Sequence, residues 1–424
     1  MINEVFVVLI LSLCNLFLIV SVCAGLKAGK KETKVPISID SGTKSKEIVS
    51  KEENVIVDKS PSLPKEDPEK DKAKDISMRR IEERTPGKKF ESSGWKTSDN
   101  RTFRGDQRKT WAVEIAKMKI VQVAKLHKEK VKGYQDFKQT YKHFEANVNL
   151  NRYADVLCID SSRVVLKGRK NDYIHASWVY VPAKKSSYIL TQGPLNETTS
   201  DFWAMCYQEK VRNIIMLCSF FEGEVEQCAL YLPEKPGDKE KYGNMEVTFV
   251  RKEEEPIECV AWSTVSVVDT EKPGSQPLKI NHFAVPWWAD QLAPDDPKLT
   301  IQLYQLMKKI NPAGKPIVVH CNSGVGRSAT FVAIDYANVR LRQELEIDMV
   351  KIIRELRVMR YQAIQSHLQW LFLHVCLLEL YCQEGLIQRD AVITAFIDEF
   401  KKHADAKLQK HWKTGEEEKS KAEK

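Results

Sequence analysis

Several common signatures are missing from this chain of 424 residues. A nucleotide-binding phosphate loop needs Gly-x4-Gly-Lys followed by Ser or Thr, and that pattern does not occur. The nine histidines and ten cysteines form no zinc-type ligand cluster, and the cysteines have no disulfide-framework spacing. The sequence therefore predicts neither a metal centre nor a cofactor.

The chain also lacks a strong charge of one sign. Its net charge of +8 is modest, and much of its lysine falls in segments near the two ends. No basic motif with interleaved aromatic residues supports binding to RNA or DNA. We therefore expect no nucleic-acid partner.

Core-forming residues are scarce in the first third of the chain. Residues 27–101 are dense in Lys, Glu, Ser and Pro, as in the stretch 65–72, and such a composition cannot bury enough apolar surface to fold. We therefore expect a disordered charged linker over residues 27–110. It would be followed by one domain with a leading helix over 111–385, and by a C-terminal helix and charged tail over 386–424.

The first segment, residues 1–26, is the longest hydrophobic one. The stretch Val5–Leu26 is almost wholly apolar and close to the ~20 residues that cross a bilayer. Glu4 precedes it and lysines follow it, which favours a single-pass membrane anchor with the rest of the chain in the cytoplasm. Val22–Ala24 resembles a signal-peptidase site, so secretion after cleavage is the alternative. Glycosylation of the sequon at Asn100 would place the linker in the lumen and contradict the cytoplasmic orientation.

One apolar run, residues 317–320, is followed by a loop that contains glycine and one cysteine. Five residues separate Cys321 from Arg327. Gly324 and Gly326 allow the backbone to curl so that successive N–H groups point at a tetrahedral oxyanion. The helical pattern that begins at Arg327 would direct its positive end to the same point, which favours a phosphate and a thiolate. The segment therefore predicts a phosphate-binding nucleophile.

A second pair, Cys206 and Arg212, has the same spacing. It contains no glycine, and it lies in a stretch that reads as helix from Asp201. Because such a segment cannot wrap an anion, we interpret Cys206 as an ordinary, partly buried cysteine.

Hydrophobic periodicity predicts an α/β fold. Strands are expected at 213–218, 245–250, 260–268 and 278–285, and helices near Asp201, Lys298, Ser328, Met349 and Ser366, between Trp111 and Phe144, and at Ala391–Phe400. We infer a twisted mixed β-sheet flanked by helices. Cys321 would lie just beyond a strand end, where open α/β sheets usually bind ligands.

Further motifs accompany the cysteine loop over residues 130–385. They are Asn151–Val156, Asp172–Ser177, Thr191–Pro194, Asp201–Trp203, Trp288–Asp290 with Pro294, and the late residues Arg354, Arg357, Arg360, Gln365 and Gln369. In this order, and with His320 before the cysteine, they resemble the motifs of the tyrosine-specific protein phosphatases. The chain looks like a divergent member of that family. The resemblance implies the family's fold, and tyrosine-phosphorylated proteins as partners.

The resemblance assigns catalytic roles to five residues. Cys321 would attack phosphorus and form a cysteinyl-phosphate, and Arg327 would hold two phosphoryl oxygens with its planar fork. Asp290 would be the general acid and then the general base. Ser328 would donate to the cysteine sulfur, and Gln365 would position the water.

A second set would bind the substrate. Tyr153 would stack on the substrate's ring and set a pocket depth that phosphoserine cannot span, and Asp155 would bond the peptide backbone. Trp288 would anchor the acid loop, and Gln369 would support the catalytic glutamine. The set is completed by the loop interior, Asn322, Ser323, Gly324, Val325 and Gly326, which lacks the lysines of phosphoinositide phosphatases. Glu222 falls where the family has a carboxylate that holds the loop arginine, with a turn residue as the alternative.

The chain departs from the family pattern at several positions. Ala289 replaces the usual proline of the acid loop, Leu292 replaces a usual glycine, and Gln227 replaces a common lysine. We therefore expect the loop to close less reproducibly. The alternative function is a weakly active or inactive phosphotyrosine-binding scaffold, but retention of every reacting group favours the enzyme. Other replacements, His175, Asn322, Ser323 and Ala329, remove no reacting group.

Overall fold

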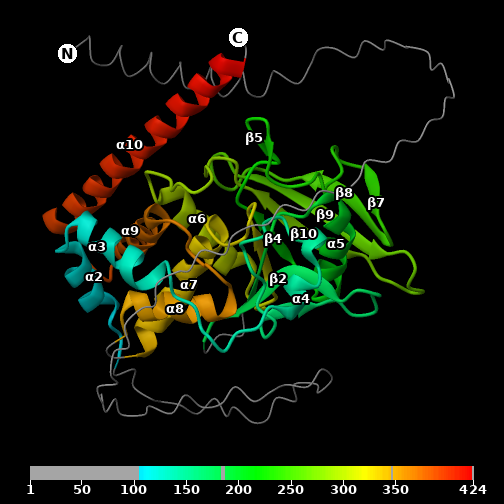
Figure 1. Cartoon of the computed structure of the whole chain (residues 1–424), viewed down its shortest axis with the longest axis horizontal. Helices are drawn as coiled ribbons and strands as arrows, with labels where there is room; N and C mark the ends of the chain where they lie inside the picture. Colours follow the sequence, from blue (N-terminus) through cyan, green and yellow to red (C-terminus); the bar gives the residue numbers. More distant parts are fainter. Residues whose placement is uncertain (1–104, 183–186, 345–346, 423–424) are drawn as a thin grey trace, which may run out of the picture. The chain divides into compact units, whose positions relative to one another are not determined.

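The computed structural model describes residues 105–182, 187–344 and 347–422, all within one compact unit, Ser93–Lys424 (Figure 1). The apolar segment Val5–Leu26, most of the expected linker and the sequon at Asn100 lie outside the described residues. Among the helices that the structure describes, none combines the length and the apolar character needed to cross a membrane.

A nine-stranded mixed sheet forms the centre of this unit, in the order β1-β2-β3-β11-β4-β10-β9-β8-β7. The strands are β1 (Arg163–Val165), β2 (Tyr173–Tyr180), β3 (Ser187–Thr191), β4 (Asn213–Met216), β7 (Lys239–Tyr242), β8 (Met245–Lys252), β9 (Ala261–Asp269), β10 (Leu278–Ala284) and β11 (Ile317–His320). A separate hairpin pairs β5 (Phe221–Glu222) with β6 (Val225–Glu226). The mixed α/β fold and the four expected strands are confirmed.

The middle of the sheet is parallel and its two sides are antiparallel. Strand β11 runs parallel to both β3 and β4, and β10 runs parallel to β4. All four residues of β11 are buried, because helices cover both faces of a parallel sheet and apolar runs are needed there. Parallel strands end at a common edge, and His320, the last residue of β11, brings Cys321 to that edge.

Helices pack on this sheet and on one another. They are α5 (Thr199–Gln208), α6 (Lys298–Ile310), α7 (Arg327–Gln343), α8 (Met349–Met359) and α9 (His367–Gln383). Helix α9 contacts α6 and α7, and it is apolar nearly all round because it is buried on most sides. Helix α7 follows directly on the cysteine loop and is almost entirely buried, which makes it a rigid support for that loop.

Two helical expectations need correction. The pattern between Trp111 and Phe144 is not one leading helix but α2 (Arg108–Ala116), α3 (Ile120–Leu126), the π-helix η1 (His127–Val131) and α4 (Lys142–Glu145). The chain breaks at Lys119, whose backbone is extended and whose N–H donates to the Gln122 side chain at 3.0 Å, so that a new helix begins. At the other end, the helix expected at Ala391–Phe400 continues to Ala422 as α10, red in Figure 1.

Candidate active site

The loop between β11 and α7 curls as its glycines require. Gly324 has φ +70°, and a Cβ atom there would lie 2.1 Å from the carbonyl oxygen of Thr191 on β3. Only glycine fits such a position. The Gly324 N–H donates to the Sγ atom of the buried Cys321 at 3.2 Å, so the amide points into the loop. The Gly324 amide therefore lies where it could also donate to an oxyanion beside the cysteine.

Arg327 is fully buried and joins three segments at the loop. Its Nη1 donates to the carbonyl oxygen of Trp288 at 2.8 Å and to the Glu222 carboxylate, and its Nη2 lies 3.2 Å from Oδ1 of Asp290. Its Nε and Nη2 are buried and have no hydrogen bond. Burial opposes the charged form, but the electrostatic interactions with Cys321, Asp290, Cys218 and Glu222 together raise the pKa of the guanidinium. A cation with two N–H groups that make no hydrogen bond thus lies at the start of α7, ion-paired with Asp290.

The acid loop is anchored by Trp288. The indole is 1% exposed, its Nε1 donates to the carbonyl oxygen of Leu292 at 2.9 Å, and its edge packs on Phe372 of α9. The side chain of Asp290 is partly exposed, and its N–H donates to Glu222 at 3.3 Å. This carboxylate lies beside Arg327 at the mouth of the loop.

Two neighbouring carboxylates have other partners. Asp296 accepts a hydrogen bond from the N–H of Lys298 at 2.8 Å at the start of α6, and Asp295 lies 3.8 Å from Nζ of Lys401 on α10. Of the three acid-loop aspartates, Asp290 is the one ion-paired with Arg327.

The β5–β6 hairpin connects two of the sequence departures. Asn322 donates through Nδ2 to Oε1 of the buried Gln227 at 2.8 Å. A lysine at position 227 could not accept this bond, so the two replacements are matched to each other. Glu222 on the same hairpin accepts a hydrogen bond from Nη1 of Arg327. It is therefore more than the turn residue of the alternative interpretation.

The two glutamines lie against the loop at Gly326. A Cβ atom at Gly326 would lie 2.8 Å from Nε2 of Gln369 and 3.3 Å from Oε1 of Gln365. Gln369 is buried and forms a capping box with Ser366 at the start of α9, and its Nε2 has no hydrogen bond. The Oγ of Ser328 is also buried without a hydrogen bond. The expected bond from Ser328 to the cysteine sulfur is therefore not formed, and the Gly324 amide contacts that sulfur instead.

The motif Asn151–Val156 contains two of the expected substrate-binding residues, Tyr153 and Asp155. Tyr153 is 37% exposed, and burial together with the negative charge of Asp290 raises the pKa of its phenol. Asp155 is exposed, and its carbonyl oxygen accepts a hydrogen bond from Nε2 of Gln362 at 3.2 Å.

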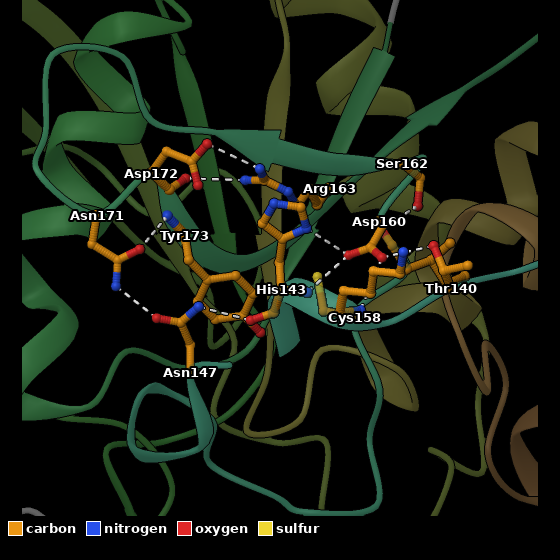
Figure 2. A network of polar contacts seen from close by, with 12 residues as sticks. Thr140, His143, Asn147, Cys158, Asp160, Ser162, Arg163, Asn171, Asp172 and Tyr173 are labelled. Atoms are coloured by element: carbon orange, nitrogen blue, oxygen red, sulfur yellow. Dashed lines mark hydrogen bonds and ion pairs between the residues drawn. The ribbon is translucent and has the colours of Figure 1, made fainter. Parts of the chain in front are cut away.

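Figure 2 shows a network of polar contacts that includes Asp160 and Tyr173. Asp160 accepts hydrogen bonds from the Thr140 hydroxyl at 2.7 Å and from Nδ1 of His143 at 2.8 Å, which fixes the start of α4. The Tyr173 hydroxyl donates to Oδ1 of Asn151 at 2.5 Å, and Asn151 in turn donates to the carbonyl oxygen of Phe144 at 3.1 Å. These bonds tie the residues before Tyr153 to strand β2.

Arg360 holds the loop from the other side, although no single motif predicts that role. It is fully buried, and it donates to the carbonyl oxygens of Gly324 at 3.1 Å and Ser323 at 2.9 Å. It also donates to Oγ of Ser177 at 3.2 Å and lies 3.3 Å from Nδ1 of His175. By binding these two carbonyls, Arg360 fixes the orientation of the peptide groups that follow Ser323 and Gly324.

A buried chain of hydrogen bonds ends at the cysteine, and the sequence gives no signal for it. Nδ1 of His320 donates to the carbonyl oxygen of Cys321 at 3.1 Å, and its Nε2 lies 2.7 Å from the hydroxyl of Tyr231. Nε2 of His282 lies 2.6 Å from the same hydroxyl. Burial lowers the pKa of His320 to about 4 and that of His282 to about 3. Both rings are therefore neutral near pH 7.

The second cysteine-arginine pair is not a site. Cys206 lies within α5 and is completely buried, more so than expected, and burial raises the pKa of its thiol. Within the described residues, no group of three or more potential ligands could hold a metal ion.

The chain is similar in sequence to a known protein family. A family model described as protein-tyrosine phosphatase matches residues 147–379, more than half of the chain. The chain belongs to the protein-tyrosine phosphatase family.

Three relatives illustrate the likeness. The chain is 32% identical over 257 residues to receptor-type tyrosine-protein phosphatase F of Danio rerio, covering 59% of this chain and 13% of that protein. It is 35% identical over 249 residues to the Lar-like tyrosine-protein phosphatase of Caenorhabditis elegans, covering 57% and 11%. It is 34% identical over 248 residues to tyrosine-protein phosphatase non-receptor type 2 of Rattus norvegicus, covering 58% and 59%. The match thus spans a small part of the two longer relatives.

Proposed function

We propose that this chain hydrolyses phosphotyrosine in proteins through a cysteinyl-phosphate intermediate. The observation that carries the proposal is the arrangement around Cys321. The Gly324 amide donates to the buried sulfur of Cys321, and the same loop begins α7 with Arg327, whose Nη2 is ion-paired with the carboxylate of Asp290 and whose Nε and Nη2 make no hydrogen bond. A phosphoryl group needs these three kinds of partner at once: a nucleophile, charge stabilisation and a proton donor.

In the first step the sulfur of Cys321 attacks phosphorus. An S–P bond forms while the bond between phosphorus and the tyrosine oxygen breaks. Arg327 stabilises the charge on the equatorial oxygens with its planar pair of donors. Asp290 gives its proton to the departing tyrosine oxygen, and the dephosphorylated protein leaves.

In the second step a water molecule breaks the S–P bond. Gln365, which lies over Gly326, orients the water, and Asp290 takes the proton that the water loses. Inorganic phosphate leaves and the cysteine is restored. Ser328 would need another side-chain rotamer to donate to the departing sulfur, and its Oγ has no hydrogen-bond partner to give up.

The alternative is a protein that binds phosphotyrosine with little turnover. It is motivated by Ala289 and Leu292, which leave the acid loop without its usual proline and glycine. The pairing of Asp290 with Arg327 at 3.2 Å favours the enzyme, because the acid reaches the site despite these replacements.

Turnover of a phosphotyrosyl peptide by the purified full chain tests the proposal, with the matching phosphoseryl peptide as the control. We expect hydrolysis of the first alone. Cys321→Ser should abolish turnover but still bind the peptide, because the amide donors and Arg327 remain. Arg327→Ala should weaken both. Peptide binding by the wild type without turnover would support the scaffold alternative.

Membrane anchorage through Val5–Leu26 stays a proposal as well. It rests on the apolar length of that segment and on the lysines that follow it. Expression of the full chain in cells, followed by digestion with an N-glycosidase, tests it. A mobility shift that Asn100→Gln removes would place the linker in the lumen and contradict a cytoplasmic catalytic domain.

A further inference from the structure

The segment just before the catalytic glutamine has a strained backbone. Gln362 has φ +56° and Ile364 has φ +61°. A β-branched residue in the left-handed region is a genuine outlier, and its backbone conformation is strained. It persists only where the surroundings over-determine the conformation. The contacts of Ile364 show what holds it.

Both the N–H and the carbonyl oxygen of Ile364 form hydrogen bonds. Its N–H donates to the carbonyl oxygen of Val325 in the cysteine loop at 2.9 Å. Its carbonyl oxygen accepts hydrogen bonds from Nη2 of Arg357 at 3.0 Å and from Nε2 of His127 at 3.0 Å. Arg357 also donates to the carbonyl oxygen of Ala363 at 2.9 Å. Two separate side chains thus hold one carbonyl oxygen.

His127 reaches this carbonyl from outside the region that matches the family. It begins the π-helix η1, in which its own carbonyl accepts a hydrogen bond from the N–H of Lys132, five residues on, at 2.8 Å. Single π-turns are frequent at functional sites. The ring is 1% exposed and packs on Trp370 of α9. Because a carbonyl can only accept, Nε2 carries the hydrogen. Burial lowers the pKa of His127 to about 4, so the ring is a neutral donor near pH 7.

We propose that His127 is a positioning residue for Gln365, and through it for the hydrolysis of the cysteinyl-phosphate. The carbonyl of Ile364 and the N–H of Gln365 belong to one planar peptide group. Holding that oxygen therefore fixes the direction in which the Gln365 side chain leaves the backbone. This inference rests on the proposed function.

The role predicts an effect on the second step alone. Cys321, Arg327 and Asp290 carry the first step, and none of them is hydrogen-bonded to His127. A misplacement of a reacting group by about 1 Å can cost on the order of 100-fold. Loss of the His127 donor should therefore slow breakdown of the intermediate by roughly 10- to 100-fold, with formation unchanged.

A matched pair of variants separates the hydrogen bond from packing. His127→Gln keeps an N–H donor on an unbranched side chain, and His127→Met has a similar shape without the donor. The full chain is mixed rapidly with an activated aryl phosphate, and release of the phenol is followed in time. For His127→Met we expect a stoichiometric burst at the wild-type rate, a lower kcat, an unchanged kcat/KM and more trapped phosphoenzyme. His127→Gln should behave like the wild type, and Gln365→Ala should reproduce the effect of His127→Met.

The outcomes separate the two proposals. If His127→Met lowers kcat and kcat/KM by the same factor, or if His127→Gln loses as much kcat as His127→Met, the positioning role is wrong. If His127→Met does not fold, His127→Phe serves as the donor-free variant with a ring. A wild type that forms no phosphoenzyme and shows no turnover contradicts the proposed function itself, whatever the variants do.

Discussion

Replacement of Gly324 by alanine is the most direct test of the cysteine loop. The added Cβ would lie 2.1 Å from the carbonyl oxygen of Thr191 and 2.9 Å from Nη2 of Arg360. Thr191 is the last residue of β3 and pairs with His320 on β11, so it cannot move without disturbing the sheet. The loop must shift instead, and with it the Gly324 amide that contacts Cys321.

The expected magnitude has two parts. A non-glycine residue in the left-handed region costs about 1–2 kcal/mol. A side-chain atom forced into a packed interior costs about 1–3 kcal/mol more. Gly324→Ala should therefore lower the free energy of unfolding by about 2–5 kcal/mol. A loop displaced by about 1 Å should also lose on the order of 100-fold in kcat/KM.

Gly168→Ala is the matched control. Gly168 has φ +75°, close to that of Gly324, but a Cβ atom there would meet nothing within 4 Å. It should lose only the backbone part, about 1–2 kcal/mol, with unchanged turnover. Urea unfolding and peptide hydrolysis measure both variants. Equal destabilisation of the two, or wild-type turnover by Gly324→Ala, would refute the packing argument.

Three further expectations concern the acid and the buried histidines. Asp290→Ala should lower turnover of phosphotyrosyl peptide by roughly 10²- to 10⁴-fold. The loss should be smaller for an aryl phosphate whose leaving group needs no proton, and equal losses on both substrates would contradict the assignment. Ala289→Pro should raise turnover by restricting the acid loop, and a gain that persists in the Asp290→Ala background would rule that reason out. Burial lowers the pKa of five histidines from 6.5 to about 3 or 4, so the unfolded chain binds their protons first as the pH falls. Stability should be complete above about pH 6.5 and decline towards pH 4, by up to ~1.4 kcal/mol per pH unit for each histidine, and urea unfolding that does not change between pH 7 and pH 4.5 would contradict this. The five are His127, His175, His282, His320 and His374.

The sequence predicts those strands, helices and loops that are determined by a few consecutive residues. The run 317–320 and the glycines after it identify a strand and an anion-binding loop, because both are encoded within a few consecutive residues. The central strands and the helices that begin near Lys298 and Ser366 follow from hydrophobic periodicity in the same way. Short edge strands such as β1 carry too few residues for a periodic signal.

Contacts between distant residues are what the sequence did not reveal. The Tyr231 hydroxyl lies between two histidines that are 51 and 89 residues away along the chain. Arg360 is recognisable as part of a late arginine pattern, but its grip on Gly324 depends on how α8 packs against β2. In the sequence, His127 is one polar residue in a lysine-rich helical stretch. Its hydrogen bond to the carbonyl oxygen of Ile364, 237 residues away, is visible only in the structure.

The charge balance around Arg360 has a practical consequence. Arg327 is balanced by Glu222 and Asp290, whereas the hydrogen-bond partners of Arg360 are two carbonyls, a hydroxyl and a neutral histidine. Burial lowers the pKa of Arg360, a sign that its charge is held at a cost. On the proposed function, an oxyanion bound in the loop whose carbonyls Arg360 holds would add negative charge to this region. Free phosphate at 100 times its dissociation constant would add about 2.7 kcal/mol to stability, so the product that occupies the site would also preserve the fold during storage.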